Sequence, residues 1–78
     1  MSSPARLATL LDRLAPWLER FAIERGRIVV AVNVQARRLE LELAIAEGEH
    51  DLVTLAIELL DQVDEIVGVV IAMAGARS

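Results

Sequence analysis

The sequence predicts an α+β domain in which two helices pack on one face of a three-stranded, mostly antiparallel sheet. Two segments repeat apolar residues every three to four positions, as an amphipathic helix does. Two others alternate apolar and polar residues, which is typical of half-buried strands. The last apolar segment, residues 66–74, carries no charge and is apolar on both alternations. We therefore expect one domain over residues 1–78, with the element order α-β-β-α-β.

The first helix is expected over residues 4–25. Pro4 suits the first helical position, where its missing N–H leaves no hydrogen bond unmade. Pro16 lies inside the pattern and predicts a kink or break just before it, and Gly26 provides a C-terminal stop. The apolar stripe recurs at spacings of four and three, through Leu7, Leu11, Leu14, Leu18 and Phe21.

Two strands are expected next, over residues 27–35 and 38–46, and they follow each other closely enough to form a hairpin. Pairing Val34 with Leu39 puts all the alternating apolar residues of both strands on one face. Ala36-Arg37 lacks the Asn-Gly type of pair that a two-residue turn prefers. We therefore favour a four-residue loop over residues 35–38, which avoids positive φ angles.

A second helix is expected over residues 51–64 and a third strand over residues 66–74. Gly48 ends the preceding strand, and Asp51 is a suitable N-cap. A helix between two strands usually crosses over to a neighbouring strand. We prefer a sheet in which the first strand is central, flanked by the second and the third, because its outward residues are the least charged.

Composition excludes several classes of site. The chain has 78 residues and no cysteine, so it has no disulfide, no thiolate zinc site and no cysteine nucleophile. The formal charge is −4 and every basic residue is an arginine, which argues against nucleic acid or an anionic membrane as the partner. No signal peptide or membrane-spanning run is evident, and we expect a cytoplasmic protein.

Neither a catalytic nor a metal or cofactor site is expected. The only histidine, His50, lies in an acidic loop at residues 47–51, where consecutive side chains point in different directions and do not converge on a metal. No histidine accompanies a Ser or Thr nucleophile, and no glycine-rich phosphate loop is present. The alternative interpretation is a ligand- or metal-binding regulatory domain that uses this loop and the carboxylates of the second helix, namely Glu58, Asp61, Asp64 and Glu65.

The most informative feature is the outward face of the expected sheet. Whichever alternation of residues 66–74 faces the helices, the other stays apolar and uncovered, and contiguous apolar surface of this kind marks an interaction site. We expect a non-enzymatic module that forms a homo-oligomer, most simply a dimer. The expected interface residues are Val29, Ala31, Ile66, Val70 and Ala72.

Three segments, residues 14–18, residues 39–43 and Thr54-Leu55, carry a resemblance to a known family. They look like the Arg-Pro-Tyr-Leu segment of the first helix, the second strand and the Thr-Leu pattern of the second helix in the NifU-like iron–sulfur scaffold domain. The Cys-x-x-Cys of that family would fall within residues 45–50, where this chain has no cysteine. The resemblance therefore implies the scaffold fold without cluster binding. An engineered α+β scaffold with no natural function is another interpretation.

Overall fold

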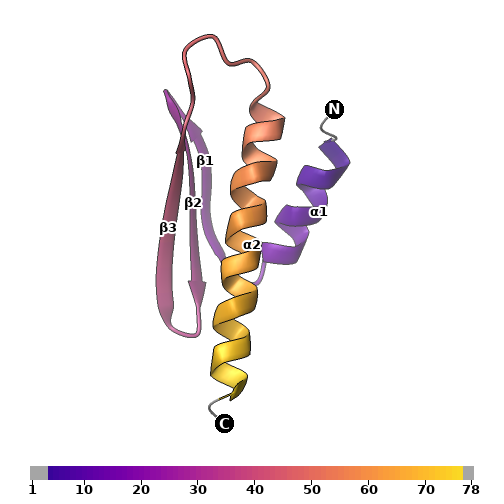
Figure 1. Ribbon diagram of the computed structural model, residues 1–78, viewed down its shortest axis with the longest axis vertical. Coiled ribbons are helices and arrows are strands. Elements are labelled where there is room, and N and C mark those ends of the chain that lie inside the picture. The colour runs from indigo at the N-terminus through magenta and orange to yellow at the C-terminus, as the bar shows by residue number, and fades with distance from the viewer. Residues whose placement is uncertain (1–3, 77–78) are drawn as a thin grey trace.

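The computed structural model describes residues 4–76 and confirms the α+β class (Figure 1). Three consecutive antiparallel strands form one sheet, with the second strand between the first and the third. A helix precedes the sheet and a longer one follows it, which makes the order α-β-β-β-α. The elements are α1 (Pro4–Leu14), β1 (Leu18–Glu24), β2 (Arg27–Val34), β3 (Arg37–Ala44) and α2 (Leu52–Ala76).

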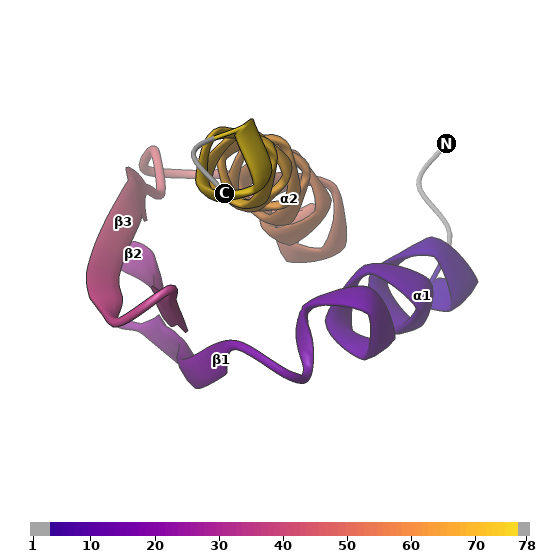
Figure 2. The same cartoon turned by 90° about the horizontal axis from the view of Figure 1, so that it is seen from below.

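The sheet is curved, and the helices lie on its concave side (Figure 2). Helix α2 runs along the sheet, and α1 packs against α2 beyond the β1 edge. The core forms where the inner faces of the strands meet the two helices. Its most fully buried large side chains come from α1, β2 and α2, and they are Leu10, Leu14, Ile28, Val30, Val32, Val34, Leu60 and Val63.

The expected first helix, residues 4–25, is only half as long as predicted. It ends at Leu14, in front of Pro16, where a break is expected, but the chain then continues as strand β1. A β-bulge at Glu19 explains the misleading pattern, because the pairing shifts between Leu18 and Arg20. An extra residue in a strand puts two side chains three positions apart on the same face. Leu18 and Phe21 therefore both face the core at a spacing that resembles a helix.

The expected third strand, residues 66–74, is the C-terminal half of helix α2. The buried stripe of this helix continues without a break through Val63, Val67 and Val70 at spacings of four and three, as one face of a helix requires. No proline interrupts it, and Gly68 alone does not end a helix that packing holds in place. Because residues 66–74 are helical, β1 occupies the edge of the sheet next to β2 where residues 66–74 were expected.

The β2–β3 hairpin is tighter than expected. Val34 pairs with Arg37, and Val32 pairs with Leu39, so the register differs from the expected one by two residues. A shift of two keeps every side chain on its expected face. Gln35 and Ala36 alone form the turn, with φ angles of 54° and 62°, the positive values that the expected four-residue loop would have avoided.

The junction between β3 and α2 follows the sequence prediction. Gly48 turns the chain with a φ of 86°. Asp51 caps α2, since the Thr54 amide donates to Asp51 Oδ1 at 3.0 Å and the Thr54 hydroxyl donates to Oδ2 at 2.6 Å. The first bond satisfies one of the N-terminal backbone N–H groups that the helix itself leaves unpaired, and the second fixes the Asp51 carboxylate in place.

Helix α2 is longer than the sheet that it covers. At 1.5 Å per residue, its 25 residues span about 37 Å, whereas the eight residues of β2 or β3 span about 26 Å. Figure 1 shows the C-terminal turns of α2 extending past the β2–β3 turn. The end of this helix therefore has no strand beneath it.

Candidate functional site on the second helix

The outward face of α2 changes character halfway along the helix. In residues 52–65, the acidic half, this face carries Glu58, Gln62 and Glu65, all exposed. In residues 66–76, the apolar half, there is no charged or hydrogen-bonding side chain at all. The same stripe continues there as Val69, Ala72 and Ala76, again exposed. The chain therefore presents an apolar surface on the outward side of the C-terminal half of this helix.

Large apolar side chains are concentrated on this apolar half. Val69 and Met73 are each 54% exposed and Ile71 is 38% exposed. Among the described residues, Ile23 on β1 is the one other large apolar side chain with comparable exposure. Scattered exposed apolar residues are ordinary, but Val69 and Met73 lie one turn apart on the same side of the helix and form a patch with the small residues beside them. Ile71, two residues from each, lies on the α1 side instead.

Small residues lie between the large ones. Gly68, Ala72 and Ala76 are spaced by four, so they follow one line along the helix. A Cβ added at Gly68 would meet no atom within 4 Å. The apolar half thus offers both projecting side chains and hollows that a second helix can fill.

Charged residues flank the apolar half on the α1 side. Arg13 of α1 forms an ion pair with Asp64 of α2 at 3.1 Å, and one turn earlier Arg6 pairs with Asp61 at 2.9 Å. A shallow groove lies beside the first pair and is lined also by Trp17, Val67, Gly68 and Ile71. These two ion pairs neutralise the carboxylates that face α1.

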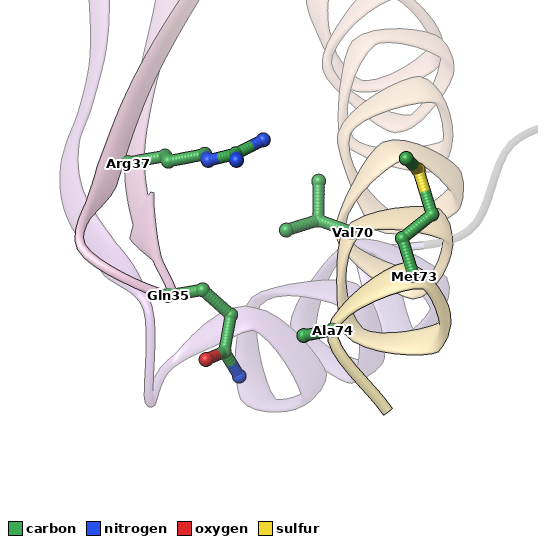
Figure 3. A pocket seen from close by; sticks show the side chains of 5 residues that line it. All are labelled: Gln35, Arg37, Val70, Met73 and Ala74. Atoms are coloured by element: carbon green, nitrogen blue, oxygen red, sulfur yellow. The ribbon is translucent and has the colours of Figure 1, made fainter. Parts of the chain in front are cut away.

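A hollow of about 260 Å³ lies on the other flank, between the hairpin and the end of α2. Gln35 and Arg37 line it from the hairpin, while Val70, Met73 and Ala74 line it from the helix (Figure 3). The guanidinium of Arg37 reaches from β3 toward Val70. Within residues 4–76 this guanidinium forms no ion pair, and the exposed carboxylate of Glu65 forms none either.

The outward face of the sheet is covered by charged side chains of its own strands. Arg27 on β2 bonds to Glu24 on β1 at 2.9 Å and to Glu42 on β3 at 2.7 Å. Arg38 on β3 reaches across β2 to Glu19 on β1 at 3.1 Å. The aliphatic parts of such long side chains shield apolar neighbours from water.

Two of the expected interface residues, Val29 and Ala31, lie under this charged layer. Val29 is 1% exposed and Ala31 is 0% exposed, so neither is accessible to a partner. The expectation of an uncovered apolar sheet face is therefore wrong. It failed because the charged neighbours cover a strand whose own outward residues are apolar.

The other three expected interface residues lie on the apolar half of α2, apart from the first two. Ala72 is exposed on the outward stripe, whereas Ile66 and Val70 are half-buried, with Val70 packed against the core. Sequence reasoning missed Val69 and Met73 as the most exposed members. Extending the stripe of the preceding helix through Val67 would have placed them on the outward face.

The acidic loop does not assemble a metal site. In the part of the chain that the structure describes, no three His, Cys, Asp or Glu side chains come together in a way that could hold a metal ion. The Glu49 carboxylate instead accepts a hydrogen bond from the Asp51 amide at 2.9 Å. Between residues 4 and 76, neither helix combines the length and apolarity needed to cross a membrane.

Comparison with protein-family models, curated proteins and solved structures finds no match for this chain.

Proposed function

We propose that this chain is a non-enzymatic self-association module and that the apolar half of α2 forms the contact between two copies. The observation that carries the proposal is the change along one helix face, from Glu58, Gln62 and Glu65 to Val69, Ala72 and Met73. A helix exposed to water on that side favours polar residues throughout. The apolar half has the composition of a helix that is covered.

A second copy is the simplest occupant because the surface is self-complementary. Small residues lie beside large ones on the same helix, so Val69 of one copy can fit over Ala72 of another. Two-fold contacts between identical patches are the commonest way in which soluble chains associate.

The expected association is weak. Eleven residues make a helix segment about 16 Å long and about 10 Å wide, which falls short of the roughly 800 Å² per partner in a standard stable interface. We expect a dissociation constant in the micromolar range or above, with the dimer fraction rising with concentration.

The test compares two glutamate variants, made at apolar positions of similar exposure. Val69→Glu places a charge in the proposed contact, whereas Ile23→Glu, at 51% exposure on β1, places one on a surface outside it. Sedimentation equilibrium should show Val69→Glu as a folded monomer under conditions in which the natural chain and Ile23→Glu dimerise. Equal association by all three would overturn the proposal.

A further inference from the structure

We infer that the two α2 helices of the proposed dimer run antiparallel, with Glu65 of each copy placed beside Arg37 of the other. This inference rests on the proposed function, because it specifies the geometry of that same contact. It depends on charge at the two ends of the apolar half.

The two ends carry opposite charges. Glu65 lies at the N-terminal end of the apolar half, exposed on the outward stripe. Arg37 lies near the C-terminal end, where it lines the hollow with Met73 and Ala74 (Figure 3). Both groups lack an ion-pair partner within residues 4–76, although the two carboxylates on the α1 side have theirs.

A parallel pair would place like charges together. In that arrangement equivalent residues face each other, so Glu65 would approach Glu65 of the partner subunit, and Glu58 would do the same. Like charges placed side by side repel. The N-terminal end of the contact would then oppose association.

An antiparallel pair brings opposite charges together twice, once at each end. If Val69 faces Ala72 of the other copy, Glu65 lies level with Ala76 of that copy. At 1.5 Å per residue, this level is about 3–5 Å past Met73 and Ala74, within the reach of the Arg37 side chain. The same register fits the large Val69 against the small Ala72 on both sides of the two-fold axis.

Cysteine cross-linking can test the orientation cleanly, because the chain contains no cysteine of its own. Two single variants are needed, Glu65→Cys and Ala76→Cys. In the antiparallel dimer, residue 65 is about 16 Å along the axis from residue 65 of the partner, too far for a disulfide, which needs Cα atoms within about 7 Å. Residue 65 of one copy and residue 76 of the other are level.

We expect little covalent dimer from either variant alone under mild air oxidation and a 65–76 disulfide, identified by peptide mass, when the two are mixed. Self-linking of each single variant would establish a parallel pair and overturn the inference while leaving self-association in place. Absence of any linked product from a chain that does dimerise would also overturn it. A natural chain that stays monomeric would overturn both proposals.

Charge reversal supplies an independent readout. Glu65→Arg and Arg37→Glu should each raise the dissociation constant on the order of two- to tenfold, and the double variant should restore it. High salt should diminish the difference between each single variant and the natural chain. A double variant no better than its single parents would overturn the proposed pairing.

Discussion

Val34 and Arg37 lie directly opposite each other in the β2–β3 ladder, so Gln35 and Ala36 alone close the hairpin. Both turn residues have positive φ angles, 54° and 62°, which cost an L-amino acid about 1–2 kcal/mol because Cβ approaches the following carbonyl. Two-residue turns of this hand usually contain Asn-Gly. The hairpin therefore holds local strain that strand pairing offsets.

Relieving that strain should stabilise the domain. We expect Ala36→Gly to raise the free energy of unfolding by roughly 0.5–1 kcal/mol, because glycine adopts positive φ freely. The greater entropy that glycine loses on folding offsets part of this gain. Ala44→Gly is the matched control, since Ala44 is exposed at the end of β3 without a positive φ. It should lower stability instead. Thermal unfolding of both variants checks this, and a loss at both positions would contradict the turn geometry.

Helix α1 is held to the domain through its buried leucines. Leu14 is 0% exposed and packs in the core with residues of α2, so Leu14→Ala should reduce the free energy of unfolding by about 2–5 kcal/mol. Leu7 is half-buried near the start of the helix, so Leu7→Ala should reduce the free energy of unfolding by clearly less. Urea unfolding measures both. Equal small losses would show that α1 does not dock as described.

Val29 should affect stability without affecting assembly. Its side chain lies under the charged layer on the outward sheet face, at 1% exposure, and Val29→Ala removes about two buried methyl-sized groups, worth about 2 kcal/mol. The dissociation constant of the dimer should stay unchanged once the variant is folded. Weaker association at unaltered stability would instead support an interface on the sheet face.

The glycines of α2 and its preceding loop should respond in opposite ways. Gly68 lies inside the helix with open space around an added Cβ, so Gly68→Ala should raise the stability of the dilute monomer by roughly 0.5–1 kcal/mol. Gly48 has a φ of 86°, and alanine there should destabilise the fold. Thermal scans distinguish these outcomes. A loss at Gly68 would contradict a helix through residues 66–76.

Local periodicity predicted the class of the fold, the β2–β3 pairing faces and the Asp51 cap, because each depends on neighbouring residues. Periodicity gave the wrong element where a strand and a helix space their buried residues alike. The bulge at Glu19 gave strand β1 the spacing of a helix, with Leu18 and Phe21 on one side. Only the pairing with β2, which follows β1 after a two-residue turn at residues 25–26, distinguishes the two.

The C-terminal segment failed for a related reason. Residues 66–74 are rich in β-branched side chains and apolar all round, which fits a buried strand as well as a helix end. The segment is a helix because its buried residues continue the stripe of the preceding turns of α2 through Val67. The sequence could thus indicate the segment that carries exposed apolar side chains but not which of them are exposed, since that depends on which element the segment forms.

The most direct test is the molar mass of the unaltered chain, measured by sedimentation equilibrium over a wide range of concentration. The monomer has a mass of 8.5 kDa. We predict that the weight-average mass rises with concentration toward twice that value and that the rise disappears in Val69→Glu. A mass that remains at the monomer value at every concentration would contradict self-association through the apolar half of α2.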